Sequence, residues 1–336
     1  MRPAAIRSAP AILLATTIVT ASAIVIATAI VSATAIVTAA AVVPAVAFGL
    51  PDRGQAPQSV FRAGVDAVAV DVSVRDGRRA IAGLTAADFE VLDNGVPQQV
   101  TDVSYGRLPV DVTVALDTSL SVTGDALTRL RRAILQLMAD LGPEDRLKLT
   151  TFNMRITRVV GLSNEPGAVE AALRAVQTGG GSSIWDAAGV ALVAAGAAGT
   201  DRRQLVVLFT DGADSASTLT PDAVLDVARR TNAALTTVVA EAVRVPDALF
   251  SMRQMLDDRT RSRIFGRLAE ETGGAVLTVG GDMTGTFRRA LEEFRASYVL
   301  HFSPVGVARP GFHTLEVRVP GRRGADVRAR RGYFGG

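Results

Sequence analysis

Apolar and polar residues alternate over residues 65–74, which have the sequence VDAVAVDVSV. A period of two predicts a strand with one buried face, and here the valines at 68, 70, 72 and 74 share the face opposite Asp71. A second strand, FEVLD, ends just before Asn94-Gly95, the residue pair that a tight hairpin turn favours. The segment VPQQVTDVSY is then expected to return antiparallel. Residues 60–106 are therefore predicted to form a small all-β domain.

From Leu108 onward the pattern changes to strands and helices in alternation. The run QLVVLFT at 204–210 is apolar on both faces, which is typical of a central parallel strand covered by helices. The fold class predicted for residues 107–297 is α/β, with a doubly wound, mostly parallel, Rossmann-like sheet. Residues 298–336 are β-rich again and too few for a separate domain. We expect this C-terminal β segment and the N-terminal flank to form one accessory β unit.

The first 50 residues form an apolar leader. No charged residue occurs between Arg7 and Asp52, and this run exceeds the roughly 20 residues that span a bilayer. Ala45-Val46-Ala47 presents small residues as a signal peptidase site does. Residues 1–50 are therefore predicted to be a signal peptide cleaved near Ala47 or, because the run is unusually long, an N-terminal membrane anchor. Residues 51–59, rich in Pro, Gly and polar side chains, are predicted to be a linker, and the protein to be exported: periplasmic, cell-surface or secreted.

Composition excludes several classes of function. The chain has no cysteine and two histidines, which excludes disulfides, thiolate zinc sites and histidine-rich metal sites. Its formal charge of +3 is far below the basic excess of a typical nucleic-acid binder, so we expect no nucleic-acid partner. The arginine-rich stretch at 318–331 is interpreted as a solvated strand face.

Oxygen-bearing side chains gather where predicted strands end. One group is Asp117-Thr118-Ser119-Leu120-Ser121, a later one contains Asp211, and a glycine-rich loop between them presents Ser182 and Ser183. Alternate residues of an extended chain share a face, so Asp117, Ser119 and Ser121 can converge. Ligands of doubly wound domains bind beyond these strand ends. The alternative is that Ser121 or Thr123 only caps the following helix.

This donor set predicts a site for a hard divalent cation. Oxygen ligands without His or Cys suit Mg²⁺, Mn²⁺ or Ca²⁺. Two carboxylates neutralise such an ion, and a site that keeps waters has a position left for an incoming ligand. A partner protein's acidic side chain is the natural occupant, and metal and partner should then raise each other's affinity.

These residues resemble the von Willebrand factor type A (VWA) domain. Its metal ion-dependent adhesion site (MIDAS) uses an Asp-x-Ser-x-Ser loop, a Thr from a second loop and an Asp from a third. DTSLS at 117–121 matches the first element, and FTDGAD at 209–214 matches the third. In the second element, GGSSIWD at 180–186, a serine stands at the usual threonine position. The metal ligands that the resemblance implies are Asp117, Ser119, Ser121, Ser182 and Asp211.

The flanks carry a further resemblance. GLTAADFEVLDNGVPQQV before the α/β part and ARRGYF near the C-terminus are similar to the exported bacterial "VWFA-related" proteins common in Acidobacteria. Together these features predict an exported, non-enzymatic, adhesion-type module that touches a membrane only through its possible anchor.

Other readings remain open. A Mg²⁺-dependent phosphotransferase would need a lysine, and Lys148 is the only one. A Ser-His-Asp hydrolase would need His301 or His313 at the site. A scaffold with a vestigial metal site is a third reading.

Residues near the predicted site are given roles of their own. Asp214 is expected in a loop or at a helix entry, Asp186 is expected to orient the glycine loop, and Trp185 is expected to pack beside that loop. The insertion at 243–262 is either an ordered surface or a loose loop.

Overall fold

The computed structural model describes residues 67–106, 108–197, 202–211, 214–240, 248–279, 281–308 and 310–335, with the side chains of 248–258 left aside. The predicted leader, cleavage site and linker lie outside these ranges. Within them, no helix combines the length and apolarity needed to cross a bilayer.

A six-stranded sheet lies at the centre of the α/β domain, in the order β11-β10-β9-β6-β7-β8. All neighbouring pairs are parallel except β7 and β8. Every residue of β6 and β9 is buried, as expected for central strands with helices on both faces. The predicted doubly wound, mostly parallel sheet is thus confirmed. The strands are β6 (Val110–Asp117), β7 (Arg146–Phe152), β8 (Ile156–Ser163), β9 (Arg203–Thr210), β10 (Ala234–Ala240) and β11 (Val276–Val279).

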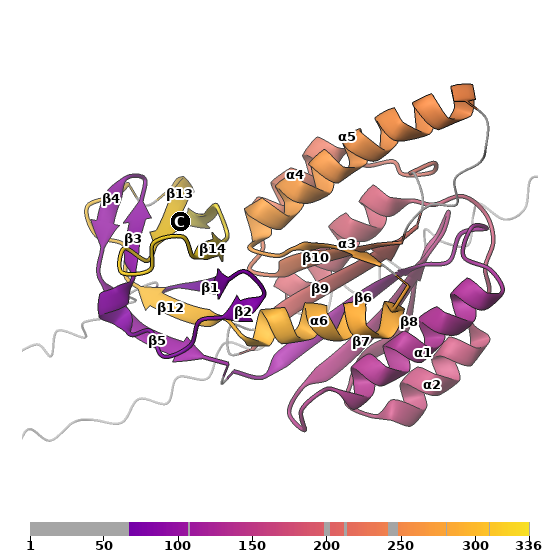
Figure 1. The fold of residues 1–336 in the computed structure, drawn as a ribbon, viewed down its shortest axis with the longest axis horizontal. Coiled ribbons are helices and arrows are strands. Elements are labelled where there is room, and N and C mark those ends of the chain that lie inside the picture. Colours follow the sequence, from indigo (N-terminus) through magenta and orange to yellow (C-terminus); the bar gives the residue numbers. More distant parts are fainter. Residues whose placement is uncertain are drawn as a thin grey trace, which may run out of the picture. The chain divides into compact units, whose positions relative to one another are not determined.

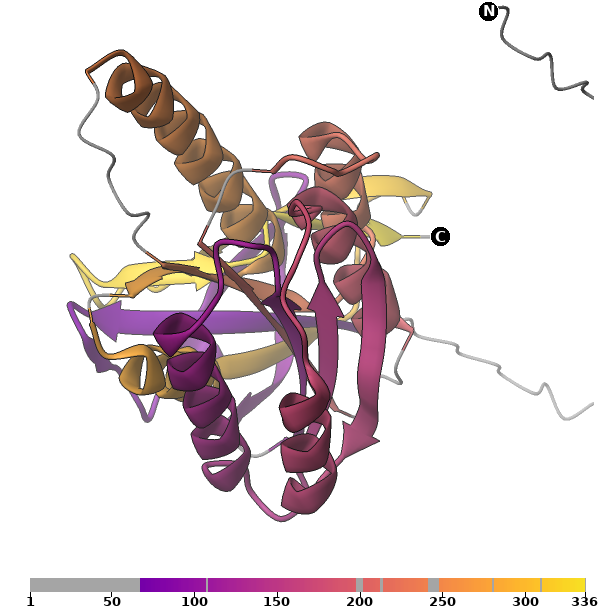
Figure 2. The ribbon, with the colours of Figure 1, turned by 90° about the vertical axis from the view of Figure 1, so that its right-hand side faces the viewer.

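Three helices cover each face of this sheet (Figures 1 and 2). One layer consists of α1 (Asp125–Ala139), α2 (Pro166–Ala175) and α6 (Met283–Arg295), and the other of α3 (Ile184–Gly196), α4 (Pro221–Arg229) and α5 (Ala248–Thr272). Successive residues of β6 serve opposite layers: Val114 packs in the first apolar cluster and Ala115 in the second. Of the insertion at 243–262, residues 248–262 belong to α5, and the rest lies outside the described residues.

The two flanks of the α/β domain form a β-sandwich. Its first sheet has the order β14-β1-β12-β5 with β2 paired to β1, and its second has the order β15-β13-β3-β4. Alternate valines of β1, at 70, 72 and 74, are fully buried between the sheets, on the face that the sequence predicts. The elements are β1 (Val68–Asp76), β2 (Arg79–Ala80), the short helix η1 (Ala86–Asp88), β3 (Glu90–Asp93), β4 (Val96–Gln98), β5 (Val100–Tyr105), β12 (Tyr298–Phe302), β13 (Gly311–Arg318), β14 (Asp326–Ala329) and β15 (Gly332–Gly335).

The predicted hairpin turn is present between β3 and β4. Asp93 pairs with Val96, and the two residues between them have positive φ angles, 47° at Asn94 and 80° at Gly95. Two such angles define the tight turn whose twist matches that of the flanking strands.

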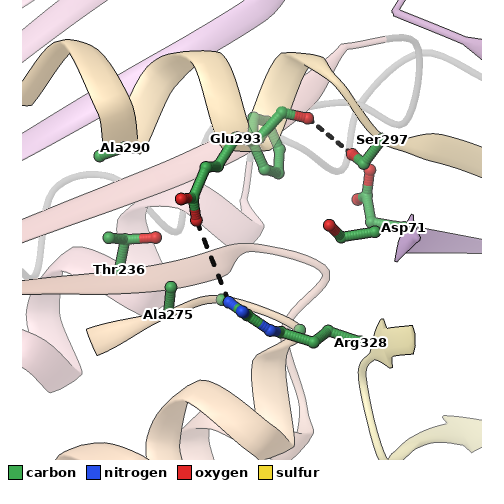
Figure 3. Close-up of a pocket in the computed structure, with 11 residues that line it drawn as sticks. Asp71, Thr236, Ala275, Ala290, Glu293, Ser297 and Arg328 are labelled. Carbon is green, nitrogen blue, oxygen red and sulfur yellow. Dashed lines mark hydrogen bonds and ion pairs between the residues drawn. The ribbon is translucent and has the colours of Figure 1, made fainter. Parts of the chain in front are cut away.

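Arg203, the first residue of β9, ties the sandwich to the α/β domain. Its Nε donates to Asp71 Oδ1 of β1 at 2.7 Å, and its Nη2 donates to the carbonyl oxygen of Phe294 at 2.8 Å. A cavity of about 30 Å³, the size of a water site, lies beside Asp71 and Ser297 (Figure 3). Glu293 and Arg328 form an ion pair of 4.0 Å across it.

The interpretation of 318–331 as a solvated face is wrong for Arg330. This residue is only 6% exposed and donates to Asn232 Oδ1 at 2.6 Å and to the carbonyl oxygens of Gly332 and Arg229 at 2.6 and 3.1 Å. Burial lowers its pKa to about 10. A charged side chain tolerates burial when it is paired or fully hydrogen-bonded, and here carbonyl and amide oxygens supply the acceptors.

Candidate metal centre

The five predicted ligand residues lie together at the carboxyl edge of the central sheet. Ser182 Oγ donates to Asp117 Oδ2 at 2.8 Å, and the backbone N–H of Ser119 donates to Asp117 Oδ1 at 2.9 Å. Ser119 Oγ lies 3.0 Å from Ser121 Oγ, which donates to Asp211 Oδ1 at 2.9 Å. These five residues, called the MIDAS cluster below, thus form one continuous chain of hydrogen bonds.

Asp117 is the fixed point of the MIDAS cluster. It is the last residue of β6 and fully buried. Besides Ser119 and Ser182, Thr210 Oγ1 donates to its Oδ2 at 2.9 Å. The sequence reasoning missed Thr210, although parallel pairing of Leu116 with Phe209 places Asp117 and Thr210 opposite one another. Two hydroxyls and one amide therefore set the direction of the Asp117 carboxylate.

The glycine loop is held against the first loop by backbone bonds. The N–H of Gly179 donates to Thr118 O at 2.9 Å, and the N–H of Leu120 donates to Gly180 O at 3.1 Å. Gly180 has a φ of 74°, a conformation that favours glycine. Ser182 is fixed in turn because its N–H donates to Ser215 Oγ at 2.9 Å. This bonding presents the Ser182 hydroxyl to Asp117.

Electrostatics in the MIDAS cluster favour a cation. Burial, with a further contribution from the like charge of Asp117, raises the pKa of Asp211, although the hydrogen bond from Ser121 opposes the rise. A divalent cation between the two carboxylates would offset both effects.

The donor set fits such an ion: two carboxylates and three hydroxyls, all hard oxygens. No group of three or more His, Asp or Glu side chains suited to a metal occurs in the described part of the chain, so a metal here would depend on the serines.

The alternative in which Ser121 or Thr123 caps the next helix is wrong. Helix α1 begins at Asp125, its N-cap is Gly124, and no side chain caps it. Ser121 bonds Asp211 instead.

Three neighbouring residues shape the loops. Asp214 Oδ1 accepts the N–H of Ile184, the first residue of α3, at 2.8 Å, consistent with the expected helix-entry role. Asp186 accepts the N–H groups of Thr218 and Leu219 at 3.0 and 2.7 Å, so the expectation that it orients the glycine loop is wrong. Trp185 packs against Phe265 of α5, with ring centroids 5.4 Å apart.

Two large apolar side chains stand exposed beside the cluster. Leu120 lies between the serines of the first loop and is 67% exposed, and Met154, in the turn after β7, is 66% exposed. Met154 also borders the glycine loop, because a Cβ built on Gly180 would lie 3.2 Å from its Cγ. The rim of the site is therefore partly apolar.

The groups that the enzymatic readings require lie elsewhere. Lys148 precedes Phe152, the pairing partner of Asp117, by four residues of β7, or about 13 Å of strand. Its Nζ lies 3.5 Å from the carbonyl oxygen of Ala194. His301 and His313 belong to β12 and β13 of the sandwich, where His313 Nδ1 bonds Asp93 at 2.8 Å.

In comparisons with known proteins, residues 111–267 match the family model of the von Willebrand factor type A domain. No curated protein matches the chain. Among solved structures, it is similar to an aerotolerance-related membrane protein of Bacteroides fragilis (15% identity, 55% of this chain and 98% of that one, TM-score 0.42). It is also similar to BatB of Bacteroides thetaiotaomicron (14% identity, 55% of this chain and 98% of that one, TM-score 0.42). A third similar structure is proximal thread matrix protein 1 of the mussel byssus, solved with a zinc-occupied MIDAS motif (13% identity, 59% of this chain and 48% of that one, TM-score 0.44). At these identities and scores, the similarity identifies no ligand of this chain.

Proposed function

We propose that this chain, which carries a von Willebrand factor type A domain at residues 111–267, is an exported binding protein that presents a divalent cation to a partner. Asp117, Ser119, Ser121, Ser182 and Asp211 hold the cation, and an acidic side chain of the partner protein completes its coordination. Mg²⁺ is the proposed ion, with Mn²⁺ or Ca²⁺ as substitutes of the same donor preference.

One observation carries the proposal: five oxygen-bearing side chains from three separate loops converge and contribute only two carboxylates. A divalent cation held by two carboxylates gives a site of about zero net charge, which does not repel a third carboxylate. Mg²⁺ also characteristically retains exchangeable waters, which an incoming ligand can replace. Ser121 and Leu120 are exposed, so the cluster opens toward solvent. Export rests on the apolar leader of residues 1–50.

A binding role also accounts for what surrounds the cluster. Its hydroxyls are bonded to carboxylates or to one another, and the two histidines and the lysine that the enzymatic readings require belong to other parts of the fold. The sandwich, built from both flanks, then serves as a support that leaves the carboxyl edge of the sheet accessible.

Calorimetric titration of Mg²⁺ and Mn²⁺ tests the proposal. The wild-type chain should give a one-site isotherm, and Asp211→Asn and Ser121→Ala should abolish it or weaken it by at least about tenfold, since each removes one ligand. Ser121 is exposed and Asp211 is half-buried, so both variants should fold. Asp222→Asn is the matched control, an 87% exposed aspartate on α4, and should bind as the wild type does.

The partner is sought by capture from envelope extracts with and without chelator. A protein retained only with Mg²⁺, and lost with Asp211→Asn, supports the proposal. Equal heat of Mg²⁺ binding in the wild type and Asp211→Asn, or absence of heat in the wild type, would refute it. Phosphoester turnover that requires Asp117 would favour the enzymatic reading instead.

A further inference from the structure

A second cavity, of about 530 Å³, lies where the strands of the central sheet begin, at the edge opposite the MIDAS cluster. The start of β9, the last residues of α3 and the segment after α4 form one side. Strands β1, β12 and β15 of the sandwich form the other. The volume falls within the range of about 300–1,000 Å³ that small-molecule sites occupy.

The lining of this cavity is strongly basic. Of its described lining residues, one is acidic, Asp71, and five are arginines: Arg202, Arg203, Arg229, Arg230 and Arg330. Carboxylates pair with three of the arginines: Arg202 with Asp111, Arg203 with Asp71 and Arg229 with Glu271.

The other two arginines differ in what they bond. Arg330 donates to carbonyl and amide oxygens, as described above. Arg230 has no carboxylate at ion-pair distance among the described residues, and its guanidinium lies 4.1 Å from the centre of the Phe334 ring. The exposed Arg230 therefore adds a positive charge that the described part of the chain does not neutralise.

Two guanidinium nitrogens of the lining arginines have no acceptor in the described part of the chain. Nη1 of Arg203 and Nε of Arg229 are buried, and neither has a hydrogen-bond partner in the described residues. The Arg203 side chain is only 3% exposed, and the other guanidinium nitrogens of Arg203 bond Asp71, Ser297 and Phe294. Buried donors in folded proteins are nearly always satisfied, by protein groups or by ordered water, so these two nitrogens add polar character to the wall of the cavity.

We propose that this cavity binds a small molecule through phosphate or carboxylate oxygens that accept from the exposed Arg230 and the partly exposed Arg229. The planar guanidinium presents paired donors that match both oxyanions, and an ionised acceptor makes the stronger class of hydrogen bond. Tyr333 and Phe334, from the ARRGYF segment, give the ligand's body an aromatic wall. This site is separate from the MIDAS cluster and needs no metal.

The test is calorimetry on the full chain in metal-free buffer, with pyrophosphate and citrate as probes. We expect one-site binding of at least one probe, and the tighter one identifies the preferred oxyanion. Arg230→Gln should weaken it by about tenfold or more, because a charge-assisted hydrogen bond is lost. Since Arg230 is exposed, this variant should keep the wild-type circular dichroism spectrum and melting temperature.

Two controls make the result specific. Arg331→Gln removes an exposed arginine of the same terminal segment, one that pairs with Glu270 at 2.8 Å and does not line the cavity. It should leave probe affinity unchanged, and so should Asp211→Asn, which separates this site from the proposed metal function. Failure of both probes to bind the wild type, or equal weakening by Arg230→Gln and Arg331→Gln, would overturn the proposal.

Discussion

Replacing Asp117 by alanine should destabilise the fold even without metal. The carboxylate is fully buried and accepts from the N–H of Ser119 and the hydroxyls of Ser182 and Thr210. Each buried donor left without a partner costs about 1–3 kcal/mol, and the two hydroxyls can partly compensate by turning toward one another. We therefore expect Asp117→Ala to lower the free energy of unfolding by about 3–5 kcal/mol. Asp117→Asn, which keeps the shape and one oxygen, should cost about 1–2 kcal/mol.

Urea unfolding in metal-free buffer measures this difference. Trp185, the only tryptophan, is 8% exposed and packs in the same domain, so its fluorescence reports the unfolding of that domain. Asp222→Ala, at an exposed position on α4, is the control and should stay within about 0.5 kcal/mol of wild type. If Asp117→Ala unfolds within about 1 kcal/mol of wild type, the hydrogen-bond network assigned to this carboxylate is refuted.

Three further predictions concern the same domain. A Cβ at Gly181 would lie 2.6 Å from Ser215 Oγ, whereas a Cβ at Gly179 would have no atom within 4 Å. Gly181→Ala should therefore shift Ser182 and weaken Mg²⁺ binding in calorimetry. Gly179→Ala is the control and should leave Mg²⁺ binding unchanged. Ser182→Thr, which keeps the hydroxyl, should retain Mg²⁺ binding, and Ser182→Ala should weaken it by about tenfold; equal affinities would remove this hydroxyl from the ligand set. Burial opposes ionisation of Asp145, yet the N–H groups of Val110 and Gly142 and the guanidinium of Arg295 prevail and lower its pKa. The stability that wild type gains over Asp145→Asn should be present above pH about 4 and disappear as pH falls through the lowered pKa, measured by urea unfolding at pH 7 and pH 3.

Local pattern was enough to predict strands β1 and β9 and the hairpin between β3 and β4. The valines of β1 alternate because one face is buried, and β9 is apolar throughout because helices cover both of its faces. The pairing of the strands was harder to predict from the sequence. Strand β1 lies between β12 and β14, which are more than 200 residues away in sequence. Alternation specifies a buried face, and it does not specify the neighbour.

The MIDAS cluster shows the same division. Short motifs located its five residues, because each follows a strand or a glycine turn that the sequence displays. Thr210, Asp214 and Asp186 act through bonds to residues about 30 to 90 positions away, and no local spacing encodes those partners. The burial of Arg330 was missed for a related reason: two of its three acceptors, the carbonyl oxygen of Arg229 and Asn232 Oδ1, lie about 100 residues away in sequence, at the C-terminal end of α4 and just after it.

Strand β9 joins two distant features of the molecule. It begins at Arg203, bound to Asp71 of the sandwich, and ends at Thr210, bound to Asp117, about 23 Å further along. Hydrogen bonds to β6 and β10 flank it on both sides. If a partner bound at the MIDAS cluster were pulled while the sandwich was held in place, the force would act along the length of β9. The hydrogen bonds between β9 and its two neighbouring strands would then be loaded in shear. Many of these bonds would have to break together before β9 could slide, so the strand should withstand a high force.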